Sequence, residues 1–266
     1  MYAFEYLKPT SLKEAKAMLT EHPEGKFLSG GHTLLPAMKL RLAGPAALID
    51  LSGVDGMRGI DRKGDTLVIG AFMKHREVAN SDVVKSAIPT LAEMVGTIGD
   101  PAVRHRGTIG GSIANNDPSA DYAAAAMALG ATIVTDSRRI PADDFFSGLF
   151  STALDEGEIV TAVEFPIPKR MGYQKFRNPA SRYALCGVAV AETASGEVRV
   201  SVIGAGAEGV FRVSAMENAL KANFSPDAIK DIKVPADAMA SDIHADQDYR
   251  AHLVGVMARR AVAAAK

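Results

Sequence analysis

Ser29-Gly30-Gly31-His32-Thr33 and Thr108-Ile109-Gly110-Gly111-Ser112-Ile113-Ala114 are the two stretches that decide the fold. Each contains a glycine pair, and each pattern predicts a strand that runs into a bare backbone loop. Because glycine has no Cβ atom, its N–H groups can approach an anion closely. Two such loops, each flanked by hydroxyl residues, suit the two phosphates of one dinucleotide better than a lone phosphate. The first hypothesis is therefore a bound dinucleotide cofactor.

The two stretches differ in how strongly they indicate binding. Taken alone, residues 29–33 are equally typical of a tight strand-to-helix turn. The second stretch continues as Asn115-Asn116-Asp117-Pro118-Ser119-Ala120-Asp121, and a purely structural loop needs far fewer polar side chains. Asp117 and Asp121 can accept hydrogen bonds from ribityl or ribose hydroxyls, although Asp121 is equally suited to cap the following helix.

Composition limits the classes of protein that remain. The chain has 266 residues, 47% of them hydrophobic, and a formal net charge of −1, so it can bury a sizeable core and has no electrostatic reason to bind nucleic acid. Residues 1–9 lack a basic leader, and no later stretch stays apolar long enough to span a bilayer, so we expect a cytoplasmic protein. The single cysteine, Cys186, excludes an internal disulfide and an iron–sulfur cluster held by this chain alone. No histidine spacing suggests a metal site.

The N-terminal pattern predicts a small α/β lobe that ends near residue 75. Ser11-Leu12-Lys13-Glu14 is a capping box that opens a helix. The expected elements are a helix to about residue 19, a strand at 26–28, a helix at 34–42, an extended segment at 46–51 and a strand at 66–71.

The rest of the chain predicts a second lobe and a separate C-terminal unit. Residues 76–97 look helical, 121–129 form an alanine-rich helix, and 131–135 and 159–165 are strands. Pro166-Ile167-Pro168-Lys169-Arg170 is typical of a linker. After it we expect an antiparallel meander of strands at 173–177, 185–192 and 198–203, and helices at 213–222, 226–232 and 249–265. The predicted class is α+β, with domains at 1–170 (subdomains about 1–75 and 76–170) and 171–266.

Three further patterns favour ordinary structural roles. Arg104-His105-Arg106 can neutralise phosphates or contact a partner, but a basic run in a loop is more often a solvated surface. His32 follows a glycine pair and can orient the loop or approach the cofactor. Residues 204–209 match G-x-G-x-x-G after a strand, but too little chain remains for a βαβ series, so we interpret them as a glycine-rich strand end.

A family assignment rests on three features of the sequence: the two glycine motifs, the Asp-Pro-Ser-Ala-Asp sequence at 117–121, and the later run Lys-Phe-Arg-Asn-Pro-Ala-Ser-Arg-Tyr-Ala at 175–184. Together they resemble the medium, FAD-binding subunit of the molybdenum hydroxylases, which include the carbon monoxide dehydrogenase and xanthine dehydrogenase families. The resemblance covers nearly the whole chain. It implies an FAD-binding domain of the vanillyl-alcohol-oxidase (PCMH) type to about residue 170, followed by the family's smaller C-terminal α+β domain with an antiparallel sheet.

The resemblance also implies which residues bind FAD, with no catalytic and no metal-binding residue in this chain. Residues 26–34 and 108–112 would hold the diphosphate and adjoining sugars, Ile98 and Gly99 would line the flavin path, and Asp121 would bind a hydroxyl. Val160 and Arg177 would pack near the isoalloxazine ring, where a cation stabilises reduced flavin, and Tyr183 would lie beside the ring. The implied set is Lys26, Phe27, Leu28, Ser29, Gly30, Gly31, His32, Thr33, Leu34, Ile98, Gly99, Thr108, Gly110, Gly111, Ser112, Ala114, Asp121, Val160, Arg177 and Tyr183.

Small departures from the family pattern are Ser29 and Thr33, where alanine and serine are frequent, and Arg182, where some members carry an acid. With these departures we still expect the chain to bind FAD, but the identity of the electron acceptor stays open.

By the same resemblance, a large molybdopterin-binding subunit hydroxylates the substrate and a small subunit with two [2Fe–2S] clusters carries the electrons. This chain would pass them to NAD⁺, oxygen or a quinone, in a dimer of heterotrimers. The substrate is left open among carbon monoxide, purines, aldehydes and N-heterocycles. Two alternatives are a self-contained flavin-dependent reductase or oxidase of the same superfamily and a non-catalytic flavin or nucleotide sensor.

Overall fold

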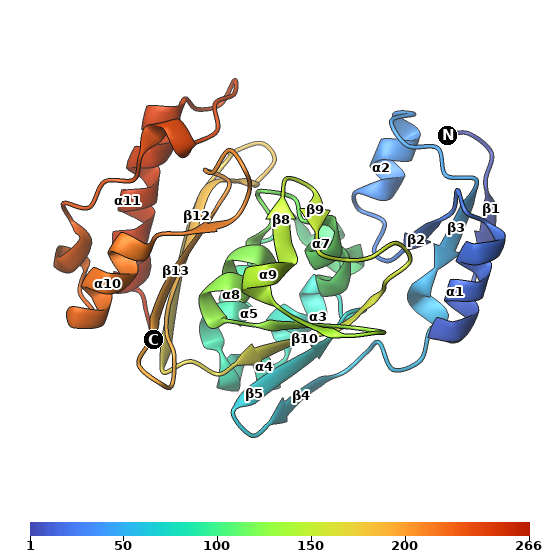
Figure 1. Cartoon of the computed structure of the whole chain (residues 1–266), viewed down its shortest axis with the longest axis horizontal. Helices are drawn as coiled ribbons and strands as arrows, with labels where there is room; N and C mark the ends of the chain where they lie inside the picture. Colours follow the sequence, from blue (N-terminus) through green and yellow to red (C-terminus); the bar gives the residue numbers. More distant parts are fainter.

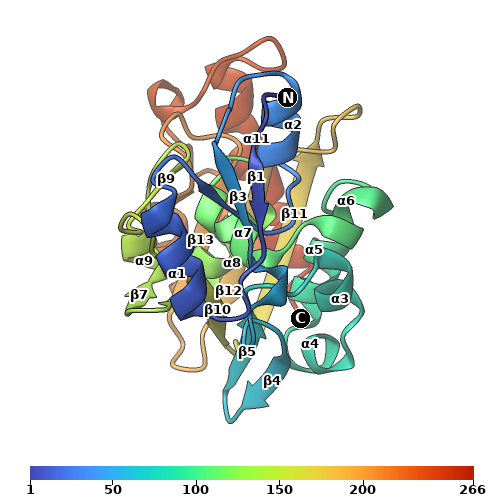
Figure 2. The same ribbon diagram turned by 90° about the vertical axis from the view of Figure 1, so that its right-hand side faces the viewer.

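Three main sheets follow one another along the chain in the computed structural model, which describes residues 1–266 (Figure 1). The first is a three-stranded parallel sheet in the order β1-β3-β2, and Figure 2 shows its strands β1 and β3 side by side. Helix α1 begins at the predicted capping box, where the Ser11 side chain accepts a hydrogen bond from the Glu14 N–H. The elements of this unit are β1 (Glu5–Leu7), α1 (Leu12–Glu21), β2 (Lys26–Leu28), α2 (Leu34–Lys39), β3 (Ala47–Asp50) and the 3₁₀ turn η1 (Leu51–Gly53).

The second unit is built on a five-stranded antiparallel sheet in the order β4-β5-β10-β6-β7. The hairpin β8-β9 forms a separate two-stranded sheet that contacts α7 and α9. The strands are β4 (Ile60–Lys63), β5 (Thr66–Gly70), β6 (Thr132–Thr135), β7 (Arg139–Pro141), β8 (Phe146–Gly148), β9 (Ser151–Thr152) and β10 (Val160–Pro166). The helices are α3 (His75–Asn80), α4 (Asp82–Ala87), α5 (Pro89–Gly96), α6 (Pro101–Arg106), α7 (Ile109–Asn115), α8 (Asp121–Leu129) and α9 (Ala142–Phe145).

The third unit is a four-stranded antiparallel sheet in the order β11-β12-β13-β14, which confirms the predicted meander. Helices α10 and α11 cover one of its faces, and α8 packs against the other (Figure 1). The elements are β11 (Arg170–Arg177), β12 (Ala184–Glu192), β13 (Val198–Ile203), β14 (Phe211–Arg212), α10 (Ser214–Ala222), α11 (Gln247–Ala263) and the 3₁₀ turns η2 (Pro226–Ile229) and η3 (Ala236–Ala238).

Helix α8 joins the second and third units. It is buried along its whole length, and it contacts both β12 and β13. Its small alanine side chains allow this close approach, and the buried Ser201 hydroxyl of β13 donates to the Ala124 carbonyl at 2.6 Å. The position of α8 matters for the site, because its first residue lies at the wall of the main cavity.

Several predicted boundaries are wrong for identifiable reasons. The single helical stretch at 76–97 is three helices, because Ser81 caps α4 and Pro89 begins α5. The strand expected at 66–71 in the first lobe is β5, which pairs with β10 in the second sheet. The segment at 226–232 is only a short 3₁₀ turn.

The largest correction concerns the second glycine pair. No strand precedes it: Asp100 caps α6, Thr108 caps α7, and Gly110 and Gly111 lie in the first turn of α7. The interpretation of residues 204–209 as a strand end is confirmed, because the chain there leaves β13 and returns as β14 without an intervening helix. The mixed helix-and-sheet class with antiparallel sheets is also confirmed. No helix has the length and apolar character that a bilayer span requires.

Candidate functional site

The main cavity has a volume of about 620 Å³, within the range of roughly 300–1,000 Å³ that is typical of small-molecule and cofactor sites. Its walls come from all three units: the β2–α2 loop, the segment around α6 and α7, the start of α8, the start of β10 and the loop before β12. It contains all the sequence-predicted cofactor residues except Arg177, which lies at the exposed end of β11: Lys26, Phe27, Leu28, Ser29, Gly30, Gly31, His32, Thr33, Leu34, Ile98, Gly99, Thr108, Gly110, Gly111, Ser112, Ala114, Asp121, Val160 and Tyr183.

The first glycine loop presents a run of free donors to this cavity. None of the backbone N–H groups from Ser29 to Leu34 donates a hydrogen bond within the chain. Gly31 has a φ of +73°, a left-handed conformation that glycine adopts readily. Successive unpaired N–H groups in a turn form a concave site for an anion. This loop therefore has the unpaired backbone donors that an anion site requires.

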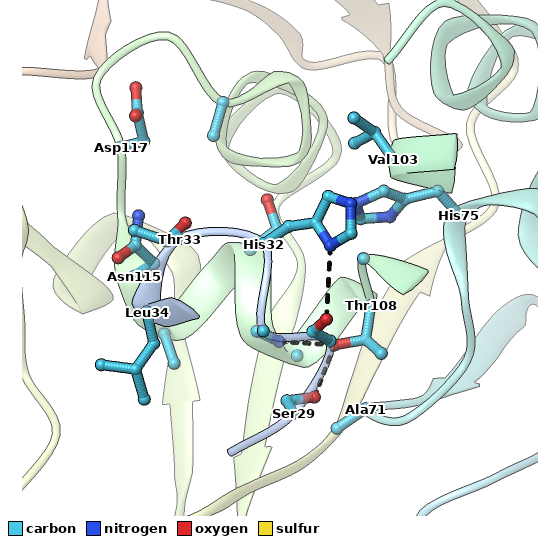
Figure 3. Close-up of a pocket in the computed structure, with 18 of the residues that line it drawn as sticks. Ser29, His32, Thr33, Leu34, Ala71, His75, Val103, Thr108, Asn115 and Asp117 are labelled. Atoms are coloured by element: carbon cyan, nitrogen blue, oxygen red, sulfur yellow. Dashed lines mark hydrogen bonds between the residues drawn. The ribbon is translucent and has the colours of Figure 1, made fainter. Parts of the chain in front are cut away.

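The first loop lies directly on the turn between α6 and α7. Figure 3 shows Ser29 of this loop beside Thr108, the residue that caps α7. A Cβ atom at Gly30 would lie 2.4 Å from the Arg106 carbonyl oxygen and 2.7 Å from the Gly107 Cα atom. Next to this crossing, the Ser29 and Thr108 hydroxyl oxygens are 2.7 Å apart. Glycine at position 30 is therefore required for two backbone segments to touch.

The second glycine pair does not form a matching cradle, because its N–H groups are already used. The N–H groups of Ile109 and Gly110 donate to the Met73 and Ala71 carbonyls at 3.0 and 2.8 Å, and that of Gly111 donates to the Thr108 hydroxyl at 3.1 Å. A Cβ atom at Gly110 would lie 2.5 Å from the Ala71 Cβ atom. The expectation of a second N–H cradle is wrong. This pair instead allows α7 to pack on the end of β5 and leaves a bare wall on the cavity.

The two predicted carboxylates lie at the wall in different environments. Asp117 accepts a hydrogen bond from the Ser119 N–H at 2.8 Å, and burial raises the pKa of its carboxyl above the ordinary value. Asp121 is buried and is the first residue of α8, whereas Ala120 occupies the cap position. The capping role considered for Asp121 is therefore not the one observed. Its carboxylate is paired with the third sheet instead, through Lys175 at 2.8 Å.

A turn at Ile98 and Gly99 is held in place by two guanidinium groups. Arg104 donates to the Ile98 and Gly99 carbonyls at 2.8 and 3.2 Å, and Arg182 donates to the Gly99 carbonyl at 3.3 Å. These basic residues lie in the last turn of α6 rather than in the expected loop. The solvated-surface interpretation is correct for His105 and Arg106, which are exposed, and wrong for Arg104. The sequence alone does not show whether a basic side chain donates to nearby backbone carbonyls, as that of Arg104 does, or faces water.

His75 is a cavity residue that the sequence analysis missed. Its imidazole is buried beside Gly107, and its ring centroid lies 5.5 Å from that of Tyr122. Burial, followed by the nearby His32 and Arg104, lowers the pKa of His75 to about 4. The ring is therefore neutral at physiological pH and contributes no charge to the wall. A lone histidine at the start of a helix carries no motif from which this could be predicted.

Glu158 is a second missed residue, and it anchors the wall just before β10. Arg138 donates two hydrogen bonds to its carboxylate, at 2.8 and 3.0 Å. The Thr135 and Ser137 hydroxyls donate at 2.6 and 2.9 Å, and the Asp155 N–H donates at 2.8 Å. Mainly because of Arg138, the pKa of this carboxyl is held far below its usual range despite burial.

The fold and the cavity define a mixed α+β protein with a cavity of about 620 Å³, lined in part by a glycine loop with unpaired backbone donors. A family model described as the FAD binding domain in molybdopterin dehydrogenase matches residues 2–168. The chain belongs to this family, and its cofactor is FAD. The resemblance seen in the sequence is thereby confirmed.

Similar proteins cover nearly the full length of the chain. The carbon monoxide dehydrogenase medium chain of Hydrogenophaga pseudoflava is 35% identical, over 98% of this chain and 96% of that protein. The nicotine 6-hydroxylase medium subunit of Paenarthrobacter nicotinovorans is 33% identical, over 98% and 96%. Among solved structures, the reconstituted CO dehydrogenase from Oligotropha carboxidovorans superposes with a TM-score of 0.90 at 31% identity, covering 99% of this chain and 97% of that one. These relatives are named as parts of oxidoreductases that act on chemically different substrates.

Proposed function

We propose that the main cavity holds FAD with its diphosphate on the free N–H groups of residues 29–34, in a subunit that relays electrons to an external acceptor. The observation that carries this proposal is the run of unpaired backbone donors in a loop that lines a cavity of about 620 Å³. An anion at such a turn is stabilised by several aligned dipoles at once, without a buried cationic side chain.

The remaining wall residues have complementary tasks in this proposal. Gly110, Gly111 and Ala114 leave bare surface along which the cofactor can lie, and the hydroxyls of Thr108 and Ser112 offer hydrogen bonds to its sugar groups. Asp121 accepts from a hydroxyl, as its position in the wall allows.

Ile98, Gly99 and Val160 also line the cavity, and in this proposal they provide a largely apolar surface for the ring system. Tyr183 offers a flat aromatic face next to it, half exposed to solvent. The role of Arg177 near the ring stays a prediction, since its side chain does not line the cavity.

Bound FAD would accept electrons singly and pass them on singly or in pairs, which is the chemistry of the cofactor itself. The chain's part is to bind, orient and partly desolvate it. The Arg104 guanidinium fixes the 98–99 turn, and Glu158 fixes the segment that leads into β10. We assign no residue of this chain to substrate chemistry, which we place on another subunit.

We infer that the electrons come from a small subunit with [2Fe–2S] clusters, which receives them from a large molybdopterin-binding subunit, in a dimer of heterotrimers in the cytoplasm. The names of the relatives as medium chains or medium subunits support the existence of larger and smaller partners. The acceptor is NAD⁺, oxygen or a quinone.

We also propose a PCMH-type FAD-binding domain at residues 1–170 and a C-terminal domain at 171–266. The family match to residues 2–168 supports the first of these. The sequence predicts a boundary between the two subdomains at about residue 75. Because β4 and β5 pair into the second sheet, we place this boundary close to residue 54 instead.

Titration of the flavin-free full chain with FAD, FMN and riboflavin tests the binding site. We expect one FAD per chain, with FMN at least about tenfold weaker because it lacks the second phosphate and the adenosine half. Riboflavin, which has no phosphate, should bind more weakly than FMN. Because the chain has no tryptophan, the change in flavin fluorescence on binding measures all three dissociation constants. Equal affinity for FAD and riboflavin would contradict a diphosphate site at residues 29–34.

A further inference from the structure

Strand β11 brings two side chains onto the buried carboxylate of the main cavity. Tyr173 and Lys175 are two residues apart and therefore lie on the same face of the sheet. The Lys175 Nζ atom is 2.8 Å from the Asp121 Oδ1 atom, and the Tyr173 hydroxyl donates to the same oxygen. The Lys175 and Asp121 side chains are only 5% and 7% exposed. The two charges are thus paired away from bulk water.

The lysine also reaches a second wall of the cavity. Its Nζ atom is 3.4 Å from the carbonyl oxygen of Thr97, the residue directly before the Ile98–Gly99 turn. Since Asp121 and this turn both line the cavity, one ammonium group connects two separate parts of the wall.

The third sheet leaves room for this arrangement at Gly187. This glycine is the cross-strand partner of Lys175 on β12, and a Cβ atom there would lie 2.8 Å from the Tyr173 hydroxyl oxygen. A side chain at Gly187 would therefore push the Tyr173 hydroxyl away from Asp121. The absence of a side chain at Gly187 therefore allows the hydrogen bond between Tyr173 and Asp121.

Burying two charges costs free energy that a surface location would avoid, and stability alone is a weak reason to keep a buried pair. The location of the pair at a cofactor cavity suggests another reason. A residue charge next to a redox cofactor changes the relative stability of the cofactor's oxidised and reduced forms. Lys175 is also the β11 cation that contacts a cavity residue, whereas Arg177 lies outside the cavity.

We propose that Lys175 is a positioning residue, which holds Asp121 toward FAD and balances its charge, so that the pair adjusts both FAD affinity and flavin reduction potential. This inference rests on the proposed function of the cavity. It assigns a role to a residue that does not itself line the cavity and that lies outside both glycine motifs, at the start of the run 175–184.

Opposite changes in the two partners test the proposal in the FAD-loaded full chain. Lys175→Met leaves the carboxylate without its counter-charge, so the reduction potential should shift downward, since reduced flavin carries added negative charge. Asp121→Asn leaves the ammonium uncompensated, so the potential should shift upward. The double variant should fall between the two. Potentials are measured by equilibration with a reference dye, followed by absorbance.

FAD affinity provides a second readout. Lys175→Met should weaken FAD binding about 10- to 100-fold, because a charge-assisted contact that orients Asp121 is lost. Lys169→Met is the matched control. Lys169 pairs with Glu192 at 2.8 Å, and neither residue lines the cavity. This control should change neither the potential nor the affinity.

Unchanged potentials in the single variants, or shifts of the same sign in both, would overturn the proposal and leave the pair a structural link between α8 and β11. If Lys175→Met does not fold, Asp121→Asn alone decides, because it keeps an oxygen that accepts from Tyr173. Failure of the wild-type chain to bind FAD would contradict the proposed function itself, which separates the two results.

Discussion

Replacing Gly30 with alanine is expected to weaken FAD binding by at least about 100-fold, equivalent to about 2.7 kcal/mol. The new Cβ atom would lie 2.4 Å from the Arg106 carbonyl oxygen and 2.7 Å from the Gly107 Cα atom. Both are backbone atoms, so no flexible side chain can move aside, and the loop itself must shift. The shift would displace the N–H groups of residues 29–34 from the cofactor phosphates. Fluorescence titration with FAD measures the loss.

A matched control separates this effect from a general loss of folding. Gly96 lies at the end of α5, and a Cβ atom there would have no neighbouring atom within 4 Å. Gly96→Ala should therefore bind FAD as the wild-type chain does. Circular dichroism of both variants checks that each is folded. A Gly30→Ala chain that is folded and binds FAD with normal affinity would place the diphosphate elsewhere.

Replacing Glu158 with alanine is expected to lower the free energy of unfolding by about 2 kcal/mol, because the buried carboxylate accepts several hydrogen bonds although its Arg138 partner is partly exposed. The substitution removes the acceptor for two Arg138 hydrogen bonds, for the Thr135 and Ser137 hydroxyls and for the Asp155 N–H. These donors would remain partly buried without a partner. Urea denaturation at neutral pH measures the change. A loss below about 1 kcal/mol, typical of a surface pair, would contradict the account of this anchor.

The same residue predicts a pH dependence with a definite sign. The pKa of Glu158 is held well below its usual range in the folded chain, first by Arg138 and then by the hydroxyl donors. A depressed carboxyl pKa stabilises the fold above the unfolded-state pKa of about 4.3, and that stabilisation is lost as the pH falls below it. Between about pH 5 and pH 2, the wild-type chain should lose stability more steeply than Glu158→Gln.

Glu93→Gln is the control for acid denaturation, because Glu93 is an exposed acid paired with Lys266 on the surface. Its stability should follow that of the wild-type chain across the same pH range. Identical acid slopes for wild type and Glu158→Gln would show that this carboxyl does not contribute the predicted dependence.

Local patterns in the sequence predicted most of the strands and the decisive loop. The Ser11 capping box, the strand before Gly30 and the meander after residue 170 depend on interactions between residues close in sequence. Such features follow from backbone geometry and side-chain periodicity. The same is true of the free N–H groups at residues 29–34, which need only a glycine turn before a short helix.

Features that depend on contacts between residues far apart in the sequence could not be predicted from local patterns. The N–H groups of Ile109 and Gly110 are satisfied by carbonyls at the end of β5, which no local pattern around the second glycine pair indicates. Lys175 pairs with Asp121 only because α8 packs on the third sheet. Arg104 belongs to a residue type that is usually found at the surface, but its guanidinium donates to the Ile98 carbonyl and holds the turn there. In each case tertiary packing decides the role of a residue whose type alone is ambiguous.

The most direct test of the central claim is affinity purification of the tagged full chain from its native host, with an absorption spectrum and mass spectrometry of everything that co-purifies. The account predicts FAD in a one-to-one ratio with the chain, together with equal amounts of a large molybdopterin-binding protein and a small iron–sulfur protein. Recovery of the chain alone, yellow with flavin, would contradict the subunit role and favour a self-contained flavoenzyme.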